Sequence, residues 1–178
     1  MIAAPIKEFR MLKVVLRLVS LAPFVLCAPA LAAQLECRVT GVVGGSTLMC
    51  LTADKKEERI RLRGIDVPGH KQPFGERARE SLVGLAHGKS ATVHWTRRDH
   101  YGRIVGAVWV KPADCQGCGH TLDVGRALLA LGMARWNRQQ ASLQPVEERH
   151  AYEFEENEAR VRGIGLWHDS NPLVPWER

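Results

Sequence analysis

The chain has 178 residues, of which 46% are hydrophobic and 25% are charged, and its formal net charge is +6. This length supports one domain with a hydrophobic core, and this composition excludes an intrinsically disordered chain. The sequence contains no internal repeat and no low-complexity tract, which excludes repeat architectures.

The first 32 residues have the pattern of a signal peptide. Four basic side chains precede an apolar stretch over residues 18–31, and Ala30-Leu31-Ala32 fits the small-x-small cleavage pattern. Met11 is an alternative start that still leaves a compact signal peptide. An uncleaved anchor is the other interpretation, but two prolines interrupt the stretch and it is short for a span. We therefore expect a secreted or periplasmic protein without a membrane span after cleavage.

Removal of this segment lowers the net charge of the chain. The four basic side chains, set against Glu8, take away half of the net charge and leave the mature chain near +3. That is weak support for polyanion binding, because nucleic-acid-binding domains usually carry a concentrated basic patch.

The next part of the chain predicts three strands. Alternating apolar and polar residues predict a half-buried strand over 35–40, and a glycine-rich turn over 44–46 leads to a returning strand over 48–52. A third strand is predicted over 59–65, with its arginines on the face opposite its aliphatic residues.

Helical and strand patterns alternate in the rest of the chain. Five short strands with a helix after the third favour an α+β fold, a five-stranded OB-fold β-barrel with three packed helices. We expect the charged residues of the last helix to form its solvated face. We expect the domain over 33–170 and an irregular C-terminal tail over 171–178. The predicted elements are helices over 74–85, 124–131 and 146–162, and strands over 91–95 and 104–110.

Four cysteines remain after the predicted signal peptide. An even number in an exported protein favours disulfides. Cys37 and Cys50 are equidistant from the centre of the first predicted hairpin, and Cys115 and Cys118 are three residues apart. The alternative is a zinc site that includes the Cys115–Cys118 pair, completed by His120 or by the first two cysteines.

Four motifs follow one another along the mature chain: Arg61-Leu-Arg-Gly-Ile-Asp66-Val-Pro68, Gln72-Pro-Phe-Gly-Glu-Arg-Ala78, Asp99-His-Tyr101-Gly102-Arg103 and Gly163-Ile-Gly-Leu-Trp167. Together they resemble the motifs of the thermonuclease (staphylococcal nuclease-like) family, in the same order. The resemblance covers nearly the whole mature chain, and it implies an OB-fold barrel with three helices.

The resemblance also implies a chemistry. In this family calcium and carboxylates hydrolyse a phosphodiester, while two arginines hold the phosphate and offset its developing negative charge. Arg61 and Arg103 match the two arginine positions, and Asp66 matches one calcium-ligand position. The implied cofactor is calcium, and the implied partner is nucleic acid or another phosphorylated or anionic ligand.

Two carboxylates of the family pattern are missing. Ser46 stands where the family has a calcium-binding aspartate, and Gly69 stands where it has the proposed general base, so the calcium site is incomplete. Loss of a general base typically costs ~10²–10⁴ in rate. His70 follows the base position, but a solvated loop histidine is the favoured interpretation. Other loose candidates for a replacement carboxylate are Glu36, Asp54 and Asp99.

The family's substrate-stacking tyrosines are also not evident, because the region over 136–140 reads Trp-Asn-Arg-Gln-Gln. We therefore predict an exported thermonuclease-like domain whose catalysis is lost or much reduced. The alternative is a non-catalytic anion-binding or accessory protein of the cell envelope. One example is exopolysaccharide (succinoglycan) biosynthesis, whose proteins include an exported thermonuclease-like member of similar size.

Overall fold

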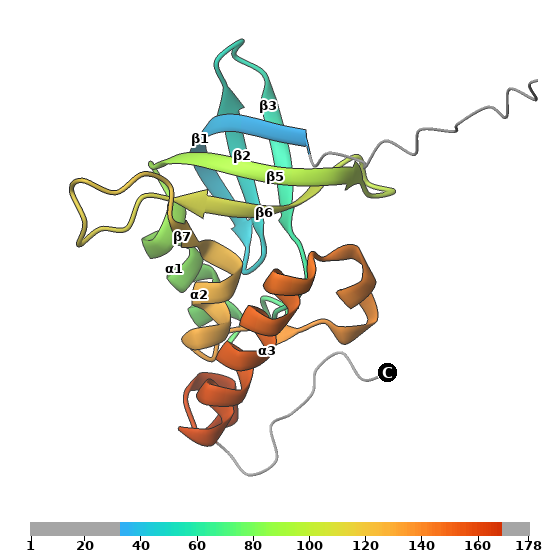
Figure 1. Ribbon diagram of the computed structural model, residues 1–178, viewed down its shortest axis with the longest axis vertical. Helices are drawn as coiled ribbons and strands as arrows, with labels where there is room; N and C mark the ends of the chain where they lie inside the picture. Colours follow the sequence, from blue (N-terminus) through green and yellow to red (C-terminus); the bar gives the residue numbers. More distant parts are fainter. Residues whose placement is uncertain (1–32, 169–178) are drawn as a thin grey trace, which may run out of the picture. The chain divides into compact units, whose positions relative to one another are not determined.

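The computed structural model describes residues 33–168, which form a closed β-barrel with helices packed beside it (Figure 1). Five strands follow the order β3-β2-β1-β5-β6, and pairing of β3 with β6 closes the ring. The β3–β6 pair is parallel and the other pairs of the ring are antiparallel. The α+β OB-fold barrel predicted from the sequence is confirmed. The barrel strands are β1 (Ala33–Gly44), β2 (Thr47–Thr52), β3 (Glu57–Leu62), β5 (Ser90–Arg98) and β6 (Ile104–Val110).

Three α-helices gather on one side of the barrel in Figure 1. The segments between them contain short strands and 3-10 turns. Of the short strands, β7 pairs with the barrel strand β6, and β4 pairs with β8. Within residues 33–168, no helix has both the length and the apolar character that a membrane span requires. The helices are α1 (Gly75–Ala86), α2 (Val124–Ala130) and α3 (Val146–Val161); the short elements are β4 (Ile65–Asp66), β7 (Leu122–Asp123), β8 (Arg135–Trp136), η1 (Arg138–Leu143) and η2 (Gly165–Trp167).

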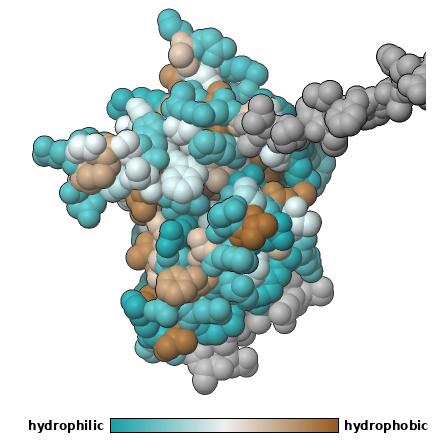
Figure 2. All heavy atoms as spheres, in the orientation of Figure 1, coloured by the Kyte–Doolittle hydropathy of each residue, from teal (hydrophilic) through white to brown (hydrophobic). Residues whose placement is uncertain are grey.

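The hydrophobic core fills the barrel and extends under α1 and α2. Leu48, Ile60 and Val93 are fully buried inside the barrel, while Leu82 of α1 and Leu128 of α2 continue the same cluster. Full burial of each such aliphatic side chain stabilises the fold by about 1.5–3 kcal/mol. The surface seen in Figure 2 is mostly hydrophilic, with hydrophobic residues scattered among polar ones.

The third predicted strand is shorter than expected and is followed by a turn. The chain turns at Gly64, whose φ of 70° suits glycine, before the short strand β4 begins. The predicted alternation holds within β3, where Ile60 and Leu62 are buried and Arg61 is more exposed. Arg63 departs from it, because it follows the strand and is 4% exposed. The turn matters for function because it brings Asp66 back towards the strand that carries Arg61.

The charged face of α3 is only partly solvated, so that expectation is wrong at two positions. Glu156 has no exposed surface and pairs with Arg138 and Arg160. Glu148 pairs with the buried Arg63 of the barrel. Charge alone does not reveal this, because the guanidinium partners come from other parts of the chain. Tyr152 and Ala159 are buried on the inner face of α3.

Disulfides join Cys37 to Cys50 and Cys115 to Cys118, with Cα–Cα distances of 5.6 and 5.5 Å. The β1–β2 register differs from the symmetric hairpin, because Cys37 pairs with Thr52 and Val39 pairs with Cys50. The pair Gly44–Thr47 places the turn two residues beyond the expected centre, and two register shifts in β1 then leave the two cysteines as diagonal neighbours across the strands. No group of three His, Cys, Asp or Glu residues within 33–168 is arranged to hold a metal ion, zinc included.

The predicted signal peptide over 1–32 and the tail over 171–178 lie outside the described residues.

Candidate functional site

Arg61 lies on β3 and Arg103 immediately precedes β6, the two strands whose pairing closes the barrel. Arg61 pairs with Val105 in the parallel β3–β6 register, and Arg103 is two residues before Val105. Because side chains two residues apart share one face of a strand, both guanidinium groups project on the same side. Burial lowers the pKa of the Arg61 guanidinium, and the positive charge of Arg103 lowers it further.

The Arg61 side chain is held by the turn that follows its own strand. It donates hydrogen bonds to the carbonyl oxygens of Leu62 and Ile65, at 3.0 and 2.9 Å, and to Asp66 Oδ1 at 3.1 Å. Burial lowers the pKa of Arg61 and the Asp66 carboxylate opposes that change. The guanidinium is therefore preorganised, with its side chain 20% exposed.

Asp66 has a second partner that sequence reasoning missed. Asn137 donates from Nδ2 to Asp66 Oδ2 at 2.7 Å, and its backbone N–H donates to Gly64 O at 2.8 Å. The short pairing of β4 with β8 brings these segments together, with Asp66 opposite Arg135. The only sequence signal was the position of Asn137 in the region where family tyrosines were expected.

Asp99 serves Arg103 and the turn between β5 and β6, so it is not a free replacement carboxylate. Its Oδ1 accepts hydrogen bonds from the backbone N–H groups of Tyr101 and Arg103, and its Oδ2 accepts from Arg103 Nε at 2.7 Å. Burial would raise the pKa of Asp99, but these hydrogen bonds together hold it below its ordinary value. Asp99 therefore positions Arg103 and is not free to act as a base.

Ser46 lies next to this site but brings no carboxylate. The Ser46 carbonyl oxygen accepts a hydrogen bond at 2.9 Å from the N–H of Leu62, the residue that follows Arg61. The Ser46 side chain is buried. The adjacent Gly45 packs against Val67, since a Cβ on Gly45 would lie 3.0 Å from a Val67 methyl carbon. The turn over 44–46 and the Asp66–Val67 segment are therefore in contact.

Gly69 lies in a loop that is fastened to the start of α1. Its N–H donates to Gln72 Oε1 and its carbonyl accepts from Gln72 N at 2.8 Å. Gly75 must be glycine, because a side chain there would collide with the Gly69 carbonyl. Within 33–168 the glycines with a positive φ are Gly64, Gly88, Gly102, Gly132, Gly163 and Gly165, so Gly69 has an ordinary backbone.

His70 and the loose carboxylate candidates have other partners. His70 is 76% exposed and its Nδ1 lies 2.9 Å from Glu76 Oε2, as a solvated loop histidine would. Glu36 accepts a hydrogen bond from Thr92 at 2.7 Å, and Asp54 bonds to Thr52 in the turn between β2 and β3.

The residues present do not fit a typical calcium site. Calcium in proteins takes six to eight oxygen ligands, usually including more than one carboxylate. Both oxygens of Asp66 accept hydrogen bonds from N–H donors, Ser46 offers a hydroxyl, and Gly69 offers no side chain. Arg61 pairs with Asp66 and Arg103 pairs with Asp99, so the formal charges balance, and an anion site here rests on the planar N–H groups of the two guanidiniums.

The aromatic side chains near the site differ in their availability. Tyr101 is 71% exposed, and the Arg103 guanidinium lies 5.1 Å from its ring centroid. The Trp136 side chain already contacts other residues of the protein. Its Nε1 donates to Gln144 Oε1 at 2.8 Å, and the Arg138 guanidinium lies 4.8 Å from its ring centroid. Tyr101 is therefore the aromatic group placed to contact a ligand of Arg103; its motif position could have indicated this.

Comparison with known proteins agrees with the motifs. A profile of the Staphylococcal nuclease homologue family matches residues 59–169. The chain belongs to the staphylococcal nuclease family. The chain is 33% identical over 153 residues to an "Uncharacterized endonuclease" of Escherichia coli, and the match covers 86% of this chain and 90% of that protein.

Two further relatives extend the comparison. "Protein ParB" of Escherichia coli is 34% identical over 158 residues, covering 89% of this chain and 86% of the relative. "Staphylococcal-like nuclease CAN1" of Arabidopsis thaliana is 37% identical over 122 residues, covering 68% of this chain and 33% of the plant protein. The family is typically calcium-dependent, which makes the absence of two carboxylate positions in this homologue a chemical difference that matters.

Proposed function

We propose that this staphylococcal nuclease homologue binds phosphate groups of nucleic acid or of another phosphorylated ligand, with hydrolysis lost or much reduced. One observation carries the proposal. Arg61 and Arg103 share one face of the β3–β6 pair, whereas Ser46 and Gly69 bring no carboxylate to that face.

The two guanidinium groups supply the binding chemistry. A phosphate oxygen is an acceptor for the planar N–H fork of arginine, and charge-assisted bonds of this kind are stronger than neutral ones. Arg103 is 27% exposed on its side chain, so it can reach a ligand while Asp99 holds its Nε. Tyr101 beside it offers an exposed ring surface to the same ligand.

The missing carboxylates argue against efficient hydrolysis. Without a general base the attacking water keeps its proton until late in the reaction, which typically costs ~10²–10⁴ in rate. Asp66 is the acidic side chain that directly contacts Arg61, and its oxygens already accept hydrogen bonds from Arg61 and Asn137. The losses act on one transition state, so their costs are not multiplied.

Titration with a nucleoside bisphosphate tests the binding half of the proposal. Arg61→Ala and Arg103→Ala should each weaken affinity by about tenfold or more, since a charge-assisted hydrogen bond is worth about 1.5–3 kcal/mol. Added salt should weaken wild-type binding. Arg38→Ala removes an exposed arginine of β1 and should leave affinity unchanged. Unchanged affinity in both site variants would show that the ligand binds elsewhere.

We also propose that the protein acts outside the cytoplasm. The sequence pattern of residues 1–32 and the two cysteine pairs support export. Cell fractionation and N-terminal sequencing of the mature protein test it, and an intact N-terminus in the cytoplasmic fraction would contradict it. A role in exopolysaccharide biosynthesis stays a prediction that gene neighbourhood can test.

A further inference from the structure

The loop between β6 and β7 carries the Cys115–Cys118 disulfide at the end of β6 opposite to Arg103. It projects from the barrel in Figure 1, whereas Arg103 immediately precedes β6. Seven strand residues separate the two ends by about 20 Å. The loop is therefore outside the phosphate site proposed above.

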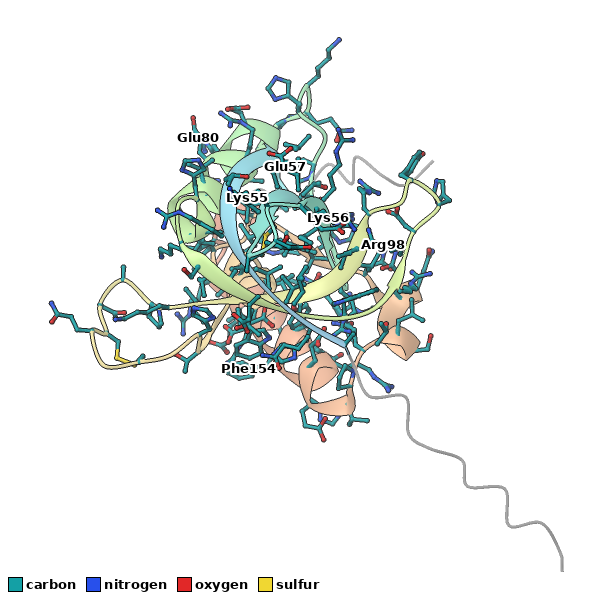
Figure 3. All side chains as sticks on the ribbon, turned by 90° about the horizontal axis from the view of Figure 1, so that it is seen from above. Lys55, Lys56, Glu57, Glu80, Arg98 and Phe154 are labelled. Carbon is teal, nitrogen blue, oxygen red and sulfur yellow. A yellow bond between two sulfur atoms is a disulfide. The ribbon has the colours of Figure 1, made fainter. Side chains whose placement is uncertain are left out.

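The two disulfides differ in their surroundings. Cys37 and Cys50 are 8% and 0% exposed within the barrel core, whereas Cys115 and Cys118 are half-buried in a loop with several exposed residues. Figure 3 shows the yellow bond of the loop disulfide well away from the barrel. A thiol in solution can approach the loop disulfide without opening the core, and access is one requirement for thiol–disulfide exchange.

A basic pocket lies against this disulfide. Its volume is about 510 Å³, and its lining includes Cys115 together with Lys89, Lys111 and His120. No carboxylate is among the described residues that line it. Two acidic residues are close to the lining: Glu36 Oε2 lies 3.8 Å from His120 Nδ1, and Asp114 lies between Ala113 and Cys115 in the chain.

The lysine charges are available to a ligand and to a sulfur anion. Lys111 donates from Nζ to the carbonyl oxygen of Gln116, which lies between the two cysteines in the chain. A carbonyl holds the ammonium in place without neutralising its charge. Neither Lys89 nor Lys111 forms an ion pair with a carboxylate in the described part of the chain. Nearby cations favour the thiolate form of cysteine.

We propose that Cys115–Cys118 is a thiol–disulfide exchange site that prefers small thiols bearing a carboxylate. The thiolate of the ligand forms a bond to Sγ of Cys115, the cysteine that lines the pocket, and the Cys115–Cys118 bond breaks. Its electron pair leaves with Cys118 as a thiolate. A second ligand thiolate then attacks the ligand sulfur of the mixed disulfide, which releases the oxidised ligand and the reduced Cys115.

The test uses three thiols of similar size on the oxidised full-length mature protein. The probes are 3-mercaptopropionate, 2-mercaptoethanol and cysteamine, which are anionic, neutral and cationic. Each rate is divided by the rate of the same thiol with a small neutral disulfide, which cancels differences in thiolate fraction and nucleophilicity. Alkylation and mass spectrometry follow each cysteine pair. Cys115 and Cys118 should be reduced at least about tenfold faster than Cys37 and Cys50. The anionic probe should react at least about threefold faster than the cationic one, and salt should shrink that ratio.

Matched variants separate a charge-selective site from simple exposure. The double variant Lys89→Gln, Lys111→Gln should remove the preference for the anionic thiol. Lys55→Gln, at the exposed tip of the β2–β3 hairpin, should keep it. Equal rates for all three probes, a preference for cysteamine, or a preference that survives in the double variant would overturn the proposal. Faster reduction of Cys37–Cys50 would also overturn it.

A trapping experiment tests which sulfur is attacked. With the disulfide of 3-mercaptopropionate, Cys118→Ser should accumulate a mixed disulfide on Cys115, because the resolving thiol is absent. Cys115→Ser should form its adduct on Cys118 more slowly, because Cys118 is not part of the pocket lining. Faster adduct formation on Cys118 would contradict attack at Cys115.

Discussion

The carboxylate of Asp66 accepts hydrogen bonds on both of its oxygens, one from Arg61 and one from Asn137. This arrangement ties the turn after β3 to the segment before η1. Both oxygens of the carboxylate that the family pattern assigns to calcium are therefore engaged in hydrogen bonds. At the scale of single residues, N–H donors therefore hold both oxygens of Asp66.

Asn137 is predicted to stabilise the fold through two roles. Its Oδ1 accepts from Gln140 N at the start of η1, and its Nδ2 donates to Asp66. Asn137→Ala should lower the free energy of unfolding by about 1–2 kcal/mol, because a cap and a partly buried hydrogen bond are both lost. Asn157→Ala, an exposed position on α3, should change it by less than about 0.5 kcal/mol. Urea denaturation measures both, and equal effects would contradict the assigned role.

At the scale of elements, Glu58 joins β3 to the end of β5. Arg98 donates to both of its carboxylate oxygens at 2.8 and 2.9 Å, and Lys56 pairs with it from the neighbouring turn. Figure 3 shows Lys56 and Arg98 on the same side of the barrel. Hydrogen bonds from Arg98 and Lys56 lower the pKa of Glu58 to about 2.

This shift predicts a pH dependence of stability. The folded carboxylate loses its proton more readily than the unfolded one, so its stabilising effect is fully present above the unfolded pKa near 4.5. The effect is lost as pH falls towards about 2. Glu58→Gln should therefore be less stable than wild type at pH 6, and the difference should shrink between pH 4.5 and 2. A difference that stays constant over this range would contradict the assignment.

Local patterns predicted the barrel well, because alternation in the strands and apolar spacing in the helices are properties of neighbouring residues. The motifs indicated Arg61, Asp66 and Arg103. Sequence reasoning could not find Asn137, because its contact with Asp66 joins residues 71 positions apart. It also missed the burial of Glu156, whose partner Arg138 comes from η1. Contacts of this kind depend on how elements pack, and short-range spacing carries no signal of them.

At the scale of the whole molecule, α3 is fastened to the barrel by a buried ion pair. Arg63 is 4% exposed, and it donates from Nε to Glu148 Oε1 at 3.1 Å and from Nη2 to Glu148 Oε2. Gln144 donates to the same carboxylate at 2.7 Å. Since the turn that carries Arg63 also carries Asp66, the docking of α3 and the geometry of the site are connected.

Removal of one partner should be costly. Arg63→Ala leaves Glu148 without its charge partner, and the free energy of unfolding should fall by about 3–5 kcal/mol. Arg162→Ala breaks an exposed pair with Glu158 on α3 and should cost less than about 1 kcal/mol. Thermal and urea unfolding compare the two variants. A loss below 1 kcal/mol in Arg63→Ala would show that the pair does not hold α3 on the barrel.

Hydrolysis of single-stranded DNA in the presence of calcium tests the central claim most directly. The assay compares the wild-type mature protein with Ser46→Asp, Gly69→Glu and the double variant. Gly69 has an ordinary φ, and a Cβ there would lie 3.2 Å from Gln72 Oε1, so the Gln72 side chain must shift slightly to admit the glutamate. Ser46→Asp restores an oxygen ligand of the kind calcium prefers, and Gly69→Glu restores a candidate base.

Wild type should show little or no calcium-dependent hydrolysis, and each single variant should recover little. The double variant should recover more than the product of the single gains, because metal and base act on one transition state. Robust wild-type activity that Asp66→Ala or Arg61→Ala abolishes would contradict the account, since the site would then work without the two missing carboxylates.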